Sequence, residues 1–178
     1  MRNQLGFTLS IALAFACTDQ PIAPTELADP PAPSLSTGPV VHHVSLGGAD
    51  VCEALGQPTG CDANFSVHAN EFADGSVKGQ WQDTFGGGNG YHAVVNCMNI
   101  VGNGAVLSGV VSSSFGAAPP VGTPAIMAVR DNGTSANDPP DQITFGFTFP
   151  GAPPCTALDP DDFAGFYLDL AKGQVKVR

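Results

Sequence analysis

Short runs of β-branched and aromatic residues, each ended by glycine, proline, asparagine or aspartate, constrain the fold of this chain more than any other feature. Strands pair across such turn residues, and Asp-Gly and Asn-Gly accept the positive φ angles of the tightest hairpin turns. With 22 glycines, 16 prolines and only 12% charged residues in 178, long helices are disfavoured. The sequence therefore predicts an all-β domain.

Two strands and a hairpin are expected in the first half of this domain. The β-branched run 40–46 predicts one strand, and residues 63–85 predict a hairpin that turns at Asp74-Gly75. Phe65 and Val67 alternate with polar residues, which is typical of a strand with one buried face.

The strongest hairpin signal lies in residues 91–111, where Asn103-Gly104 separates two apolar runs. If these two residues form the loop, Val101 pairs with Val106. Apolar residues on both faces of the first strand predict a central strand that is covered on both sides. One face is expected to carry Val95, Cys97 and Val101, and the other Val94, Met98 and Ile100.

A third hairpin is predicted from 124–131 to 141–149, and a final strand follows a turn at Lys172-Gly173. Residues 159–163 predict a short helix, capped by Asp159 with Pro160 at its first position, and residues 53–55 a further helical turn. In all, eight or nine strands predict an antiparallel β-sandwich or small barrel. Strict alternation places Ile143, Phe145, Phe147 and Phe149 on one face.

The N-terminal segment has the pattern of an export signal. Arg2 precedes an apolar run, 5–16, that is shorter than the ~20 residues of a membrane span. Residues 13–17, Leu-Ala-Phe-Ala-Cys, resemble the lipobox of bacterial lipoproteins, and that resemblance implies that Cys17 carries a lipid. Ordinary cleavage before Cys17, which leaves a free thiol, is the alternative.

The predicted organisation is a signal peptide over 1–16, an anchor and tether over 17–39, and a single β domain over 40–178. Six prolines among residues 18–39, without any apolar period, predict an extended spacer. The expected location is the bacterial cell envelope, on a lipid anchor, with secretion as the alternative.

Five cysteines in an exported chain leave one without a disulfide partner, and lipidation of Cys17 would account for it. The other four allow three pairings in an oxidising compartment. Cys52 and Cys61 flank a turn sequence, which favours a local bridge and leaves Cys97 to pair with Cys155. A four-cysteine metal site is the weaker alternative, because no C-x-x-C pair is present.

The net charge of −10, with six basic residues in all, argues against partners that carry phosphate. A nucleic-acid backbone or an anionic lipid surface would be repelled. The acidic balance favours solubility and is compatible with a cationic partner.

Two groups of residues are candidate metal ligands. His42, His68 and His92 could gather in space, although His42 and His43 lie on opposite faces of one strand. The loop 131–141 carries oxygen ligands of the kind that calcium prefers, but the turn geometry of a polar hairpin loop is the favoured explanation of its composition. Its carboxylates are Asp131, Asp138 and Asp141.

No catalytic motif is present, since the chain has neither a G-x-S-x-G elbow nor a phosphate loop, and no cofactor is expected. Trp81, Phe85 and Tyr91 lie in or near the glycine-rich run 85–92 and are candidates for a sugar-stacking platform. Their alternative role is packing in the core. The function that these patterns favour is a structural or binding domain without enzymatic activity.

The segment 73–145 combines a V-x-C strand, a G-N turn, an apolar return strand, and V-x-D-N-G followed by D-Q. This order is similar to small exported β domains of unknown function in bacterial lipoproteins and surface proteins. The resemblance implies a fold and a location, but no reaction. A cell-surface protein or a glycan is the expected partner, beside the membrane reached through the lipid.

Overall fold

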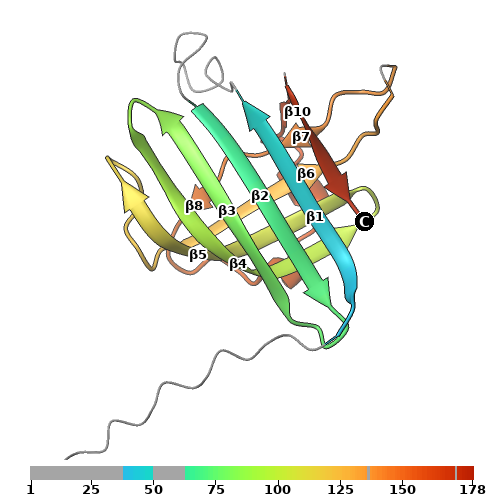
Figure 1. Ribbon diagram of the computed structural model, residues 1–178, viewed down its shortest axis with the longest axis horizontal. Helices are drawn as coiled ribbons and strands as arrows, with labels where there is room; N and C mark the ends of the chain where they lie inside the picture. Colours follow the sequence, from blue (N-terminus) through green and yellow to red (C-terminus); the bar gives the residue numbers. More distant parts are fainter. Residues whose placement is uncertain (1–37, 50–62, 136, 171) are drawn as a thin grey trace, which may run out of the picture. The chain divides into compact units, whose positions relative to one another are not determined.

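The computed structural model describes residues 38–49, 63–135, 137–170 and 172–178. Their ten strands form one antiparallel sheet in the order β10-β1-β2-β3-β4-β5-β6-β7-β9, with β8 paired to β6 (Figure 1). The sheet curls into a half-barrel, which confirms the predicted all-β antiparallel class. The strands are β1 (Val40–Ala49), β2 (Ala63–Phe72), β3 (Val77–Gly86), β4 (Asn89–Val101), β5 (Gly104–Phe115), β6 (Pro124–Arg130), β7 (Gln142–Ile143), β8 (Phe147–Thr148), β9 (Leu168–Asp169) and β10 (Gly173–Val177).

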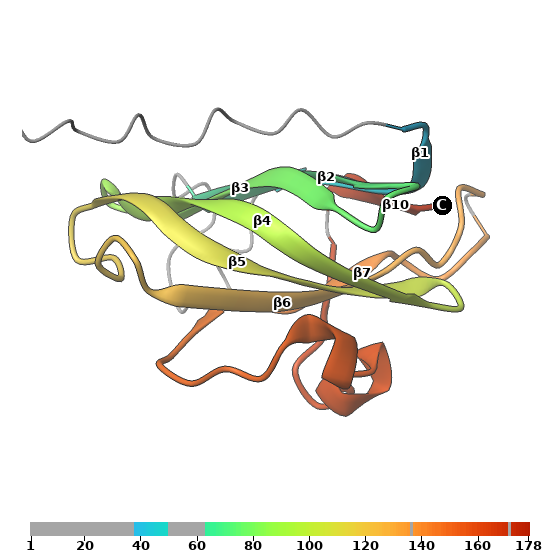
Figure 2. The same cartoon turned by 90° about the horizontal axis from the view of Figure 1, so that it is seen from below.

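The curled sheet encloses the main core. Figure 2 shows β1, β2, β3 and β10 in an upper layer and β6 with β7 in a lower layer, joined by the long twisted pair β4–β5. Within the described residues, no helix is long and apolar enough to cross a bilayer. The fully buried large side chains between the layers are Val44, Trp81, Tyr91, Val95, Leu107, Val111, Met127, Val129, Ile143 and Val175.

The hairpin β2–β3 forms as the sequence predicts. Gly75 has a φ of +78°, and the Asp74 side chain accepts a hydrogen bond from the backbone of Ser76 at 2.9 Å. Phe65 and Val67 are both buried. The aspartate stabilises the turn and the glycine supplies its backbone angle, so the local sequence is sufficient to define it.

The β4–β5 hairpin is confirmed, but its predicted loop is wrong by one residue. Val101 pairs with Gly104, so the loop is Gly102-Asn103, and Gly102 adopts a φ of +59°. Gly104 is instead needed inside β5, because a Cβ atom there would lie 2.8 Å from Pro160. The close approach of Pro160 therefore leaves room only for glycine at position 104 of β5.

The predicted division of β4 into two faces is also wrong beyond its middle. The register shifts between Val95 and Cys97, and the extra residue inverts the alternation. Val95, Met98 and Ile100 consequently pack in the main core, whereas Cys97 packs on the other side of the sheet. The bulge thus directs Cys97 away from the main core.

The predicted strand 141–149 is interrupted, which overturns the expected single aromatic face. Ile143 pairs with Val129, but Phe147 pairs with Ile126, a register shift of one residue that reverses the faces. Between them the Thr144 hydroxyl accepts a hydrogen bond from the backbone of Ala128 at 3.0 Å. Ile143 therefore lies in the main core and Phe147 on the outer side of the sheet.

The C-terminal segment crosses the outer face of the lower layer and carries two 3-10 helices, η1 (Cys155–Ala157) and η2 (Pro160–Phe163) (Figure 2). Asp159 caps η2 with Pro160 at the first position, as predicted. A second, smaller core forms beneath this segment. It is made by Val106, Ile126, Ala128, Cys155 and Phe163.

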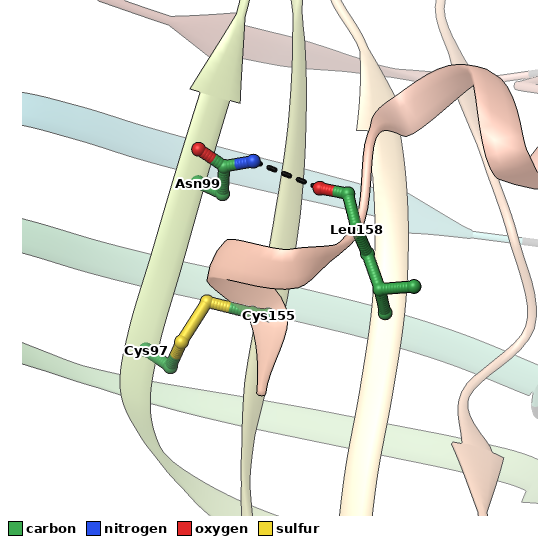
Figure 3. Close-up of a disulfide and its surroundings, with 4 residues drawn as sticks. All are labelled: Cys97, Asn99, Cys155 and Leu158. Carbon is green, nitrogen blue, oxygen red and sulfur yellow. Dashed lines mark hydrogen bonds between the residues drawn. A yellow bond between two sulfur atoms is a disulfide. The ribbon is translucent and has the colours of Figure 1, made fainter. Parts of the chain in front are cut away.

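The predicted bridge between Cys97 and Cys155 is present and joins β4 to η1 (Figure 3). Next to it, the Asn99 side chain donates a hydrogen bond to the Leu158 carbonyl at 2.8 Å. Both links fix the C-terminal segment to β4. Cys17, the predicted Cys52–Cys61 bridge and the predicted helical turn 53–55 lie outside the described residues.

Candidate functional site

The three candidate histidines do not come together as a metal site, although His68 and His92 line the same surface concavity. His42 Nδ1 lies 2.7 Å from a carboxylate oxygen of Glu71, on the neighbouring strand. The His68 ring packs against His43 with centroids 4.9 Å apart, and His92 packs against Phe115 instead. In the described part of the chain, no three histidine, cysteine or acidic side chains are placed to hold a metal ion.

The acidic loop uses its carboxylates to bind backbone amides. Asp141 is 8% exposed and accepts hydrogen bonds from Asn132 N at 2.8 Å and from Val175 N at 2.7 Å. Asp131 accepts from Val177 N at 3.1 Å, and Asp138 from Ser135 N at 2.8 Å. Val175 and Val177 belong to β10, so two of these side chains hold an edge strand to the opposite side of the half-barrel.

Asp83 is an ionisable group inside the half-barrel, opposite Tyr91 in the β3–β4 register. The Tyr91 hydroxyl donates to its carboxylate at 3.4 Å. Burial raises the pKa of Asp83 to about 7, against the opposing effect of this hydrogen bond. Burial, followed by the nearby Asp83 charge, also raises the pKa of Tyr91 far above its usual value.

A perturbed carboxyl group in a cleft is a candidate acid or base. The cavity that borders Asp83, lined by Phe65, Phe85, Met127 and others, has a volume of only about 10 Å³. That is the size of one water molecule, so a substrate has no room beside the carboxyl group. Asp83 therefore bears on stability rather than on catalysis.

The predicted sugar-stacking platform is not formed by Trp81 and Tyr91. Their side chains are 1% and 0% exposed and pack edge to face with centroids 5.4 Å apart. Gly146 lies directly over this pair, since a Cβ atom there would approach the Tyr91 hydroxyl to 2.1 Å. Both rings are core residues, the alternative that the sequence also allowed.

The most distinctive surface feature is an apolar pocket of about 290 Å³ on the C-terminal segment, which we call the phenylalanine pocket. Phe147 contacts Phe163 and Phe166, with ring centroids 5.9 and 5.3 Å apart. Phe149 and Phe166 are 43% and 57% exposed. The lining residues are Ile126, Phe147, Phe149, Pro153, Leu158, Asp162, Phe163 and Phe166.

One carboxylate, that of Asp162, lines this pocket, and two more lie at the N-terminal end of η2. The Asp162 side chain accepts a hydrogen bond from the Asp159 backbone at 2.8 Å, while Asp159 accepts from the backbone of Asp161. Asp161 forms an ion pair with Arg130, whose guanidinium also stacks 4.3 Å from the Tyr167 ring. Of these three carboxylates, Asp161 is the one paired with the guanidinium, whereas Asp159 and Asp162 accept hydrogen bonds from backbone amides.

Three interactions fix the two 3-10 helices that carry the pocket. The bridge to Cys97 and the Asn99 hydrogen bond fix η1, and the Tyr167 hydroxyl donates to the Pro160 carbonyl at 3.0 Å, which fixes η2. Burial raises the pKa of Tyr167 to about 12, so its hydroxyl remains a donor at neutral pH. The aromatic side chains are thus presented by a segment with few degrees of freedom.

A second concavity, of about 400 Å³, lies on the outer face of β2 to β5. Ser113 pairs with His92 in the strand register, but no hydrogen bond joins the hydroxyl to the imidazole. The lining of this concavity is rich in uncharged polar side chains, namely Ser66, His68, Gln80, Gln82, His92, Ser112 and Ser113. We call this concavity the polar groove.

Sequence reasoning missed the phenylalanine pocket. Its aromatic residues come from two separate stretches, 147–149 and 163–166, whose proximity no local pattern shows. The predicted bridge from Cys97 to Cys155 was the one available signal, because it returns the C-terminal segment to the sheet. No protein-family model matches the sequence, and comparisons with curated proteins and with solved structures gave no match.

Proposed function

We propose that the chain is an exported, lipid-anchored envelope protein whose β domain binds a partner through the phenylalanine pocket without catalysing a reaction. The export signal over 1–16, the lipobox-like residues before Cys17 and the proline-rich stretch that follows support the location. The resemblance of residues 73–145 to exported β domains of lipoproteins supports it as well.

The exposed phenylalanine pocket is the observation that carries the binding role. Phe149 and Phe166 leave much of their apolar surface in water although a core lies directly beneath them. Contiguous apolar surface of this kind on a soluble domain marks an interaction site, and aromatic side chains dominate the energetics of such sites. The volume, about 290 Å³, lies at the lower end of the range for ligand pockets.

The arrangement of the polar groups supports binding rather than catalysis. The carboxylates of the loop 131–141 accept backbone hydrogen bonds, and Asp83 borders a cavity of about 10 Å³. The phenylalanine pocket itself offers one ionisable side chain, Asp162. A single carboxylate against apolar walls provides recognition but no acid–base pair.

The binding role is tested with the neutral apolar dye Nile red and the full chain. We expect dye fluorescence to rise on binding, and Phe166→Ser to remove most of that rise. The control is Val121→Ser, because Val121 is 65% exposed but lies outside the pocket. Equal fluorescence in both variants and the unsubstituted protein would exclude the pocket as the site.

The location is tested separately by Cys17→Ser. Without the acceptor thiol, we expect the protein to leave the membrane fraction and the N-terminal peptide to lose its lipid mass in mass spectrometry. Membrane association that persists unchanged in this variant would contradict lipid anchoring.

Glycan binding by the polar groove is a second candidate function. Its amide, hydroxyl and imidazole groups suit a neutral ligand rich in hydroxyl groups. A glycan-array signal that disappears in a Gln80→Ala, Gln82→Ala double variant, but persists in Phe166→Ser, would favour this function over the first. A blank array would exclude it.

A further inference from the structure

We infer that the partner of the phenylalanine pocket is a cationic polypeptide segment, with one aromatic or aliphatic side chain that enters the pocket and lysines or arginines that flank it. This inference rests on the proposed function, because it specifies the chemistry of the same site. It draws on three features: the apolar lining, the carboxylates beside it, and the charge of the other surfaces that could cover it.

The apolar lining requires an apolar group at the centre of the partner. Phe147, Phe163 and Leu158 lie within the pocket, and Phe149 and Phe166 are its most exposed large side chains. Aromatic rings that meet edge to face or offset gain more than their buried area alone supplies. One anchoring side chain therefore accounts for the volume, and a polar group there would lose its hydrogen bonds to water.

The carboxylates beside the pocket require positive charge next to that anchor. Asp159, Asp161 and Asp162 follow one another around η2, and Asp162 lines the pocket itself. Within the described residues, Asp161 forms an ion pair with Arg130, which also stacks on Tyr167. The capping hydrogen bonds hold Asp159 and Asp162 without neutralising them, so negative charge remains beside the apolar surface.

Charge also argues against the other occupants of such a pocket. A second copy of the chain would bring the same carboxylates face to face, and an anionic lipid surface would be repelled as well. The chain's own residues 18–39 carry three acidic residues and no basic one. A cationic segment with an apolar anchor is the occupant that complements both the apolar lining and the carboxylates beside it.

The test uses four short synthetic peptides of equal length in a two-by-two design: the centre is phenylalanine or serine, and the flanks are lysine or glutamate. Binding to the disulfide-intact full chain is followed by calorimetry and by NMR shifts of ring resonances. We expect only the peptide with both phenylalanine and lysine to bind well, at least about tenfold more tightly than its glutamate counterpart. Its affinity should fall as salt rises.

Variants of the chain identify the groups responsible. Asp159→Asn combined with Asp162→Asn keeps the acceptor oxygens that cap η2 but removes two charges, so stability should change little. We expect this double variant to bind the cationic peptide about threefold to tenfold more weakly at low salt. The affinity should also depend less on salt concentration. Phe166→Ser should abolish binding, with Val121→Ser as the matched control.

The outcomes distinguish a failure of this inference from a failure of the proposed function. Equal binding of the lysine and glutamate peptides that contain phenylalanine, with shifts at the pocket, would overturn the charge assignment and leave an apolar binding site. Failure of every peptide, while Nile red still depends on Phe166, would also overturn the cationic partner alone. Failure of the dye and the peptides together would remove the proposed function.

Discussion

Asp83 makes the stability of the domain depend on pH in an unusual direction. Its pKa is raised by burial to about 7 from a usual value of 3.8, so the folded state binds a proton more tightly than the unfolded state. The stabilisation from that proton is complete below pH 3.8. It is lost as the pH rises from there to about 7, and the stability contributed by this group stays low at higher pH.

The size of the effect follows from the shift of the pKa. One pKa unit corresponds to about 1.36 kcal/mol, so a rise from 3.8 to about 7 gives at most about 4 kcal/mol. The side chain is half-buried, and residual contact with water reduces this to about 2 to 3 kcal/mol. Few single groups change the free energy of unfolding by this much.

The test compares the protein with Asp83→Asn by urea unfolding across a pH series. The amide carries no charge and can still accept the hydrogen bond from the Tyr91 hydroxyl, so the variant should gain stability relative to the unsubstituted protein as pH rises. We expect that difference to grow between pH 4 and 7 and then to level off. A difference that stays constant with pH, or one of opposite sign, would refute the reasoning.

Three further predictions concern the packing. Asp141→Ala should lower the free energy of unfolding by about 3 kcal/mol, because two backbone amides lose their acceptor, while Asp141→Asn should cost less; chemical denaturation measures both. Reduction of the bridge between Cys97 and Cys155, which lie 58 positions apart in the sequence, should cost about 4 kcal/mol and lower Nile red binding. Gly146→Ala should cost about 1 to 3 kcal/mol through its clash with core aromatics, measured as a lower melting temperature.

Features with local causes were predictable from the sequence. Asp74-Gly75 contains both the side chain and the backbone angle that its turn needs, and Asp159-Pro160 contains the cap of η2. The alternation around Phe65 and Val67 likewise identified a buried face without tertiary information. In each case the residues that determine the local structure are neighbours in the sequence.

Features decided by distant contacts were not predictable in this way. Asn103-Gly104 has the stronger turn sequence, yet Gly104 pairs within β5, where Pro160 approaches so closely that only glycine fits. In the break between β7 and β8, Gly146 lies so close to Tyr91, on another strand, that only glycine fits there. The phenylalanine pocket also depends on contacts that are distant in the sequence, because it requires both that break and the bridge at Cys155.

The central claim is that partners bind at the phenylalanine pocket rather than on the face of the sheet. Site-specific photo-crosslinking tests it most directly, with a photoreactive phenylalanine analogue placed at Phe166, at Gln82 in the polar groove, or at Val121 as a control, in the anchored full-length protein. The account predicts a discrete crosslinked species from Phe166 that is absent from the other two positions. The same species from Gln82 alone, or equally from all three, would contradict it.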